Sequence, residues 1–403
     1  MAITVNILME EMRETYQLKY ITGEENGENV VTWVHLTEDA SVAELFVGNE
    51  LVVTSGYTAR DEESLLRFIG EINQKPLAGL VINIGKYILE IPQSAIDLCN
   101  WYKIPLLTMP WGMSATDFAK SCCVRIERRQ LEIEQVNQAA MVAIQSPYNP
   151  SGYRPKLSEF FDESAGFQIL VISSKAPIED RRDALIRSML RIHTAVYNWS
   201  FQFLVFQMDK LFVLIVNQND RDMTDEIANH ILEIYIKHDW EQGSIHIGIG
   251  EPINSFSEFA KSYHSAIAAI RRGMMQNHTI YRFSDMGFYK LLYSIPDEGL
   301  MEEYYEQRLA PLLEYDKAHD GSYVETLFRY LLHDGSLAEV AEEMYTHRNT
   351  INYRMGKIRD LLGLQLDSQY DRFPLIMAFH IGVVLDKIPN YELDMLRMRE
   401  EKK

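Results

Sequence analysis

The chain has 403 residues, a formal net charge of -19 and a hydrophobic fraction of 47 %. This composition excludes a disordered chain, and the length favours two or three domains joined by helices. Most of so acidic a surface repels a polyanion such as DNA, so DNA binding would require a local basic patch.

The sequence has no segment typical of a secreted or membrane protein. The first twelve residues lack a basic stretch ahead of an apolar one, and the longest apolar run, 373–385, is too short to span a bilayer. The three cysteines do not make a disulfide framework and fit a reducing compartment. We therefore expect a cytoplasmic protein that does not bind a membrane.

The first third of the chain, residues 1–112, alternates apolar runs with stretches whose apolar residues recur every three or four positions. This alternation predicts an α/β domain with a mostly parallel sheet. The predicted strands cover 30–36, 50–56, 79–85 and 104–110, and the predicted helices cover 61–72 and 92–102.

Ligands of parallel sheets usually bind at the carboxyl ends of the strands, which here are the loops 54–63, 83–87 and 108–113. We expect a small-molecule effector there. The candidate ligand-binding residues are Thr54, Ser55, Gly56, Tyr57, Gly85 and Trp111. In the alternative interpretation, Gly56 and Gly85 only close turns. The loops do not distinguish an amino acid from a purine derivative, although the carboxylates of Asp61 to Glu63 could pair with an ammonium group.

Residues 113–146 predict one long helix without proline or glycine, followed by a connecting segment at 146–155 with three prolines. A seam with alternating spacing of three and four runs along this helix. Its members are Ala119, Cys122, Ile126, Arg129, Ile133, Val136 and Ala140. The seam favours a partner helix and therefore dimerisation. The alternative is a helix that lies on its own domain.

The middle segment, 147–285, follows the order strand, helix, strand, strand, helix, strand, which predicts a ferredoxin-like domain. The strands are expected at 166–173, 201–207, 211–217 and 244–250, and the helices at 181–199 and 225–240. A capping box from Ser255 to Glu258 predicts the start of one more helix.

Nucleotide cyclases are built on the same order, so an enzyme must be considered. A diguanylate cyclase carries a Gly-Gly-Asp/Glu-Glu-Phe hairpin between its central strands, whereas this turn is Met208-Asp209-Lys210. It lacks the glycines that approach phosphate and the paired acids that hold metal ions. The histidines, including His230 and His238 eight residues apart, are not at metal-ligand spacing. We therefore expect no catalytic residue, no metal site and no cofactor.

Residues 286–403 predict an all-helical domain with a helix-turn-helix at 336–362. A capping box from Ser336 to Glu339 starts the first helix, which turns Val340, Ala341 and Met344 toward a core. The pattern breaks at Tyr345, where many such motifs have glycine, and Thr346 is expected to cap the second helix. There Ile351, Met355, Ile358 and Leu362 form one buried stripe, as two closely crossing helices require.

The opposite side of this second helix is polar and basic, because residues 346–359 hold four basic side chains and no carboxylate. Asparagine suits adenine, arginine suits guanine, and bordering lysines contact phosphates. The candidate DNA-binding residues are Thr346, His347, Arg348, Asn349, Thr350, Asn352, Tyr353, Arg354 and Lys357. In the alternative, this is an ordinary solvated amphipathic helix.

These segments together predict an α+β multidomain protein with an α/β sensory domain, a long linker helix, a ferredoxin-like middle domain and an all-α helix-turn-helix domain. Residues 334–363 resemble the carboxyl-terminal helix-turn-helix of the PucR/CdaR family of bacterial regulators of purine and sugar diacid catabolism. Residues 309–331 resemble its helical lead-in. The runs 32–39, 48–57 and 104–112 resemble its sensory domain, and 244–273 its degenerate cyclase-like domain.

The resemblance implies a ligand-responsive transcription regulator, commonly an activator of a catabolic operon for an amino acid, a purine or a related metabolite. The expected partners are double-stranded DNA at a promoter or operator, a small-molecule effector, RNA polymerase, and a second copy in a homodimer or higher even homo-oligomer. Two alternatives stay open. One is a nucleotide-binding or cyclase-like signalling protein that acts through the middle domain, and the other is an interaction scaffold that does not contact DNA.

Overall fold

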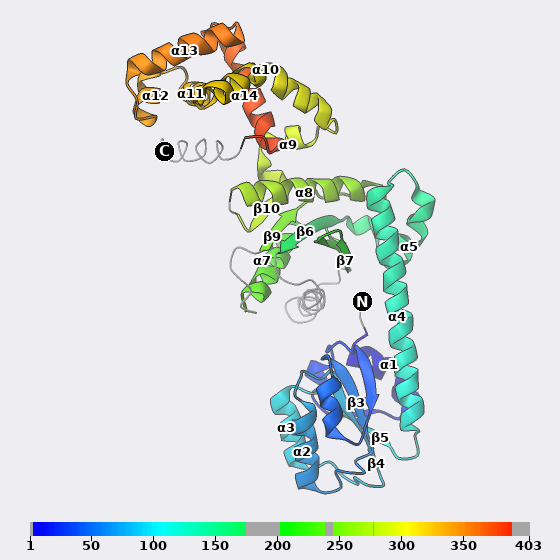
Figure 1. The fold of residues 1–403 in the computed structure, drawn as a ribbon. Coiled ribbons are helices and arrows are strands. Elements are labelled where there is room, and N and C mark those ends of the chain that lie inside the picture. The colour runs from blue at the N-terminus through cyan, green and yellow to red at the C-terminus, as the bar shows by residue number, and fades with distance from the viewer. Residues whose placement is uncertain (1–2, 175–201, 238–244, 277, 389–403) are drawn as a thin grey trace. The chain divides into compact units, whose positions relative to one another are not determined.

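The structure is a computed structural model that describes residues 3–174, 202–237, 245–276 and 278–388 (Figure 1). The five strands of the N-terminal domain are β1 (Lys19–Thr22), β2 (Trp33–Leu36), β3 (Glu50–Thr54), β4 (Gly79–Ile84) and β5 (Leu106–Pro110). They form one sheet in the order β1-β5-β4-β3-β2. The four predicted strands are confirmed and run parallel to one another.

The sequence analysis missed the edge strand β1 and the first helix, α1 (Val5–Tyr16). Strand β1 is only four residues long and pairs antiparallel with β5. None of its residues is fully buried. Its sequence therefore lacks the apolar run by which the central strands are recognised.

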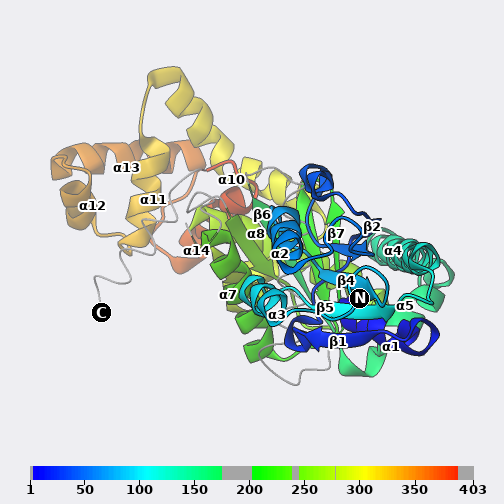
Figure 2. The ribbon, with the colours of Figure 1, turned by 90° about the horizontal axis from the view of Figure 1, so that it is seen from below.

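Helices cover both faces of this sheet (Figures 1 and 2). The predicted helices α2 (Glu62–Ile72) and α3 (Gln93–Tyr102) pack on one face, in a core shared with Val52 and Leu80. Helix α1 and the first part of α4 (Ala115–Gln145) pack on the other face, beside Val34 and Val53. All five residues of β3 are buried as a result, and its centre, Leu51 to Val53, is apolar on both faces of the sheet.

The long helix α4 is confirmed, but the expectation that its seam packs on a partner helix is not. Cys122 and Ile126 are buried in the core of the N-terminal domain. Val136 and Ala140 are buried further along the helix, which contacts the short helix α5 (Arg154–Phe160). The alternative interpretation is therefore correct at these positions, because the chain's own domains already cover the stripe.

The middle domain has the predicted ferredoxin-like order in its described part. Its strands are β6 (Gln168–Ser174), β7 (Phe203–Met208), β8 (Leu211–Val216), β9 (Ile245–Ile249) and an additional strand, β10 (Ile280–Arg282). The sheet order is β10-β9-β6-β8-β7, so the first and last strands of the predicted motif are neighbours at its centre. Helices α7 (Arg221–Lys237) and α8 (Phe259–Met275) are present, whereas the predicted helix at 181–199 lies outside the described residues.

Short 3-10 helices connect many of these elements. They are η1 (Glu24–Asn26), η2 (Ala40–Leu45), η3 (Pro150–Gly152), η4 (Glu163–Ala165), η5 (Phe256–Glu258) and η6 (Phe283–Met286). The predicted capping box lies at η5, with its bonds shifted by one residue. The Ser255 hydroxyl accepts from the Ser257 N–H, and the Glu258 carboxylate accepts from the Asn254 N–H.

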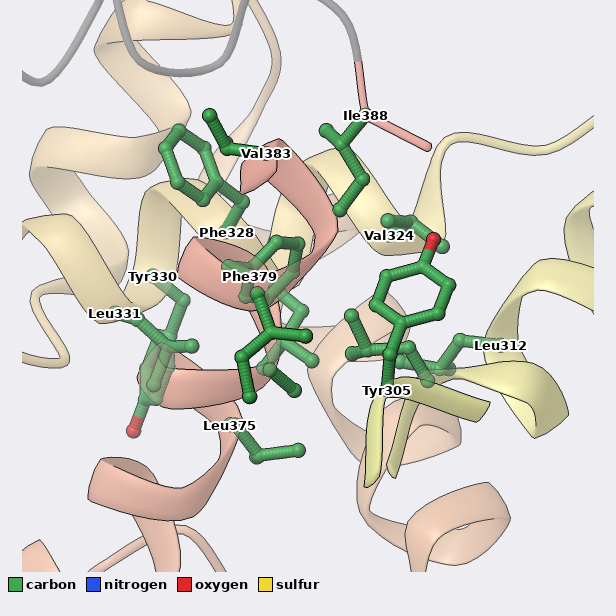
Figure 3. Packing of buried hydrophobic residues seen from close by; sticks show 14 of the residues in the cluster. Tyr305, Leu312, Val324, Phe328, Tyr330, Leu331, Leu375, Phe379, Val383 and Ile388 are labelled. Carbon is green, nitrogen blue, oxygen red and sulfur yellow. The ribbon is translucent and has the colours of Figure 1, made fainter. Parts of the chain in front are cut away.

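The C-terminal domain is all-helical in its described part, as predicted. It contains α9 (Tyr289–Tyr293), α10 (Glu298–His319), α11 (Tyr323–Leu332), α12 (Leu337–Glu343), α13 (Arg348–Leu362) and α14 (Gln369–Val384). One core joins these helices, and Figure 3 shows Tyr305 and Leu312 of α10 near Phe328 of α11 and Phe379 of α14. This core supports α12 and α13, which lie side by side in Figures 1 and 2.

Candidate functional site

The first helix of the predicted helix-turn-helix, α12, is capped at Ser336, whose hydroxyl accepts a hydrogen bond from the Glu339 N–H. Only half of the predicted capping box forms, because the Glu339 carboxylate contacts the ring of His333 instead. Val340 and Ala341 are buried and Met344 packs against the same core, as predicted. The buried side of α12 therefore faces the rest of the domain.

The turn after α12 places Tyr345 in the left-handed region, with φ at 49°. Glycine adopts this conformation readily, whereas any other L-residue is strained there. The Tyr345 side chain contributes no core packing that would offset this strain, because it is 98 % exposed. The turn thus has the shape of a glycine-containing helix-turn-helix although the sequence has a tyrosine.

Helix α13 begins one residue later than expected, which corrects the predicted cap. The cap is His347, whose Nδ1 accepts from the Asn349 N–H at 3.2 Å. The Thr346 hydroxyl donates to the Met344 carbonyl, and so serves the turn rather than the helix. The imidazole of His347 is thereby held at the start of α13.

The two sides of α13 divide as the sequence predicts. Ile351, Met355 and Ile358 are fully buried in the core of the helical domain. The other side is exposed to solvent, and the Tyr353 side chain on it is 71 % exposed. The remaining exposed residues of the predicted contact set are His347, Arg348, Asn349, Thr350 and Asn352.

Arg354 and Lys357 depart from that pattern because both contact neighbouring helices. The guanidinium of Arg354 donates to the hydroxyl of the buried Thr326 on α11. The ammonium of Lys357 lies 5.3 Å from the ring centroid of Tyr315 on α10. Both side chains are half-buried. Arg354, expected on the flank of the exposed side, and Lys357 therefore both lie at its border.

An ionic network that the sequence analysis missed fastens α12 to α11. Arg329 pairs with Glu325 at 2.9 Å and also with Glu343. The buried His333 contacts Glu339 at 2.7 Å and Glu343 at 2.6 Å through its two ring nitrogens. Glu343, which by sequence looks like a surface acid, is thus a link between the two helices. The four-residue spacing from Arg329 to His333 on one side of α11 is the only sequence signal for it.

The predicted effector loops surround a carboxylate that was also missed. The Glu38 side chain accepts hydrogen bonds from the Thr54 hydroxyl and from the Ser55 and Tyr57 N–H groups, at 3.0, 2.6 and 2.8 Å. Thr54 is 1 % exposed. Gly56, with φ at 73°, is also buried, and a Cβ there would overlap Ile88. Thr54 and Gly56 therefore shape the loop, which corrects their expected role as direct ligand contacts.

The exposed members of the predicted set do come together at the carboxyl ends of β3, β4 and β5. Tyr57 is 52 % exposed and Trp111 is 41 % exposed. The ring of Tyr87 lies between them, with centroid distances of 5.1 Å to Tyr57 and 5.3 Å to Trp111. Gly85 is exposed beside Trp111 with φ at 114°, a conformation that favours glycine.

The acidic run from Asp61 to Glu63 is engaged by protein groups rather than open to an ammonium ligand. The Asp61 carboxylate caps α2, and hydrogen bonds from the backbone N–H and the side chain of Ser64 lower its pKa. Glu62 accepts from the Ser94 hydroxyl, and Glu63 pairs with Arg67 at 3.3 Å.

The central hairpin of the middle domain has a tight two-residue turn. β7 and β8 are joined by Asp209 and Lys210 alone, with Asp209 at a φ of 55°. No group of three or more histidines, cysteines or carboxylates among the described residues is arranged to hold a metal ion. Within the same residues, no helix is long and apolar enough to cross a membrane.

Three family models match consecutive parts of the chain. Residues 8–126 match the purine catabolism regulatory protein-like family, PucR. Residues 161–271 match a GGDEF-like domain, and residues 323–381 match the PucR C-terminal helix-turn-helix domain. The chain therefore contains a PucR family domain and a PucR C-terminal helix-turn-helix domain. The last match contains the whole of α12 and α13.

Curated relatives of this chain include three proteins of Bacillus subtilis. The proline-responsive transcriptional activator PutR is 30 % identical over 33 % of this chain and 33 % of its own length. The DNA-binding transcriptional activator AdeR is 25 % identical over 35 % of this chain and 34 % of its own length. The purine catabolism regulatory protein is 27 % identical over 28 % of this chain and 22 % of its own length. The chain thus spans about a third or less of the length of these relatives.

Proposed function

We propose that this protein is a DNA-binding transcription regulator whose helix α13 enters the major groove of its operator. The observation that carries the proposal is the division of α13 into a buried apolar side and an exposed side rich in hydrogen-bonding groups. The names of the relatives, two of which are transcriptional activators, agree with it.

The exposed side of α13 has the chemistry for both kinds of DNA contact. The amides of Asn349 and Asn352 can donate to and accept from an adenine edge, and Arg348 can bind guanine through two hydrogen bonds. His347, Thr350 and Tyr353 can donate to the phosphate backbone, as can Lys357 at the border, and the half-buried Thr346 can contact it without donating. On the neighbouring helix α12, Glu339 contacts His333, and Glu343 contacts both His333 and Arg329, whereas Glu342 is exposed.

The proposed regulator has four parts: a sensory domain at 1–112, a linker helix at 113–146, a middle domain at 147–285 and a helical DNA-binding domain at 286–403. A metabolite bound at the ends of β3, β4 and β5 would change how the N-terminal core packs on Cys122 and Ile126 of α4. Turning a mostly inactive population into a mostly active one requires about 5 kcal/mol of preference for one state. One tightly bound small molecule can supply this.

The finer elements of the proposal concern partners. We expect an activator of a catabolic operon for an amino acid, a purine or a related metabolite, which would act with RNA polymerase. Two copies of α13 in a homodimer or higher even oligomer would read two half-sites, whose separation must match the two-fold geometry of the protein. The dimer contact must use surfaces other than Cys122 and Ile126, because these two side chains are buried within the chain.

Fluorescence anisotropy with a labelled fragment of the promoter beside this gene tests the proposal. Asn349→Ala and Arg348→Ala should each weaken binding by about 1 to 3 kcal/mol, because each removes a base contact. Gln130→Ala removes an exposed amide from α4 and serves as the matched control. Unchanged affinity of both α13 variants, with normal circular dichroism, would contradict the proposed role of this helix. Turnover of a nucleoside triphosphate by the purified protein would instead favour the signalling alternative.

A further inference from the structure

An aromatic and basic surface, formed by Tyr57, Arg60, Lys86, Tyr87 and Trp111, lies where three neighbouring parallel strands end. Tyr57 and Arg60 follow β3, Lys86 and Tyr87 follow β4, and Trp111 follows β5. Arg60, Lys86 and Tyr87 do not stand out in the sequence, because the chain brings these three loops together only through its sheet. We call these five residues the aromatic-basic surface.

Two cations cover the rings of this surface. The guanidinium carbon of Arg60 lies 4.6 Å from the ring centroid of Tyr57 and 5.0 Å from that of Tyr87. The ammonium of Lys86 lies 5.1 Å from the centroid of Tyr87 and 4.6 Å from that of Trp111. The ring of Tyr87 is thus contacted by both cations. Both side chains are exposed, and within the described part of the chain neither forms an ion pair.

Among the described residues, the carboxylates closest in sequence form no ion pair with these cations. Glu38 accepts hydrogen bonds from the loop after β3. Asp61 caps α2, and Glu63 pairs with Arg67. The ends of these strands therefore carry two exposed cations that form no ion pair among the described residues, although the exposed Glu90 follows Lys86 by four residues.

The positions of these two cations indicate which charge a ligand of this surface should carry. A group of aromatic rings by itself would suit a cationic ligand. Here, however, Arg60 and Lys86 already occupy that role, and a second cation would be repelled by both. An anion would be attracted by both, and a flat conjugated body could pack on the exposed rings of Tyr57 and Trp111.

We propose that the aromatic-basic surface binds a planar, anionic small molecule, that is, a conjugated ring or amide plane that carries a carboxylate or another acidic group. This inference rests on the proposed function in one respect, since it takes the ligand to be the effector. The binding itself does not depend on DNA.

Isothermal titration calorimetry of the full-length protein with three matched probes tests this. Quinoline-2-carboxylate, quinoline-2-carboxamide and 2-(aminomethyl)quinoline share the same fused rings and are anionic, neutral and cationic. The carboxylate should bind about tenfold or more tightly than the amide, and the amine should bind most weakly. Arg60→Gln and Lys86→Gln should each weaken the carboxylate about tenfold. Lys120→Gln, which removes an exposed cation from the helix α4, should leave its affinity unchanged.

The outcomes separate this inference from the proposed function. Equal affinity of carboxylate and amide, preference for the amine, the absence of binding, or full affinity in the Arg60→Gln/Lys86→Gln double variant would each overturn the inference. The same preparations are then tested for promoter binding by anisotropy. Carboxylate binding without promoter binding would contradict the proposed function alone, and promoter binding without carboxylate binding would contradict this inference alone.

Discussion

The two candidate sites of this protein are built in different ways. The exposed side of α13 comes from one continuous helix, so the spacing of Ile351, Met355 and Ile358 decides which residues face solvent. The effector site comes from three loops that are distant in sequence. There the hydrogen bonds to Glu38 decide that Thr54 points inward, while Tyr57 remains exposed. Periodicity therefore locates a helical surface reliably, but it says little about a surface assembled from loops.

The buried stripe of α13 should give the largest effect of any single change in this comparison. Ile358→Ala should lower the free energy of unfolding by about 2 to 5 kcal/mol, because it leaves a cavity in the core of the helical domain. Urea unfolding followed by circular dichroism measures this. Thr350→Ala on the exposed side is the control and should leave the transition almost unchanged. Similar losses in the two variants would mean that α13 is not divided into two sides.

Glu38→Ala should have the next largest effect and should show that the effector loops depend on a distant residue. The change leaves the Thr54 hydroxyl and the N–H groups of Ser55 and Tyr57 without their acceptor. The expected cost is about 1 to 3 kcal/mol of stability. Binding of quinoline-2-carboxylate should weaken as well, since Tyr57 loses its support. Glu44→Ala, an exposed acid on the same domain, is the control, and an equal effect in both variants would contradict the role of Glu38.

Replacement of Tyr345 by glycine should stabilise the helix-turn-helix. The change removes the backbone strain of a left-handed tyrosine, and this outweighs the extra conformational freedom that glycine has in the unfolded chain. The free energy of unfolding should therefore rise by about 0.5 to 1 kcal/mol. Gly363→Ala provides the opposite case, because Gly363 has φ at 64° and open space around it. That change should destabilise by about 1 kcal/mol. Thermal unfolding should show a higher melting temperature for Tyr345→Gly and a lower one for Gly363→Ala than for wild type. A loss of stability in Tyr345→Gly would mean that the tyrosine side chain makes a stabilising contact.

Acidification should produce the smallest change in stability, through the Asp61 cap at the start of α2. The pKa of Asp61 is lowered by hydrogen bonds from Ser64, so the contribution of Asp61 to stability is full above the ordinary pKa of a carboxyl group. It is lost as the pH falls through the lowered pKa. The melting temperature of wild type and Asp61→Asn, compared between neutral and acidic pH, checks this. The difference between the two proteins should shrink at acidic pH, and a difference that grows would have the wrong sign.

Much of the fold could be predicted because local patterns carry it. The parallel strands β2 to β5, the helices α2, α3, α4 and α7, and the paired helices α12 and α13 all follow from apolar spacing and from turn or cap residues. The exposed side of α13 follows from the same spacing. The short edge strands β1 and β10 do not, because neither has enough residues to show a period.

The seam of α4 shows where sequence patterns stop being informative. A stripe such as Cys122, Ile126 and Ala140 states that this side of the helix is buried, but a partner helix and the chain's own domains require the same side chains. Only the packing of α4 on the N-terminal core distinguished the two. The cap at His347 was likewise decided by the turn, which directs the Thr346 hydroxyl to the Met344 carbonyl.

The amino-acid order by itself determined which residues of this protein are apolar and how often they recur, and hence its helices, its central strands and the polar side of α13. The tertiary structure alone decided which distant loops meet, namely that Arg60, Lys86 and Trp111 surround one tyrosine and that Glu38 holds the loop beside them. The physical reason is the distance along the chain over which each kind of interaction acts. Backbone periodicity acts over a few residues, whereas the contacts that build the loop surface exist only once the sheet has aligned its strands.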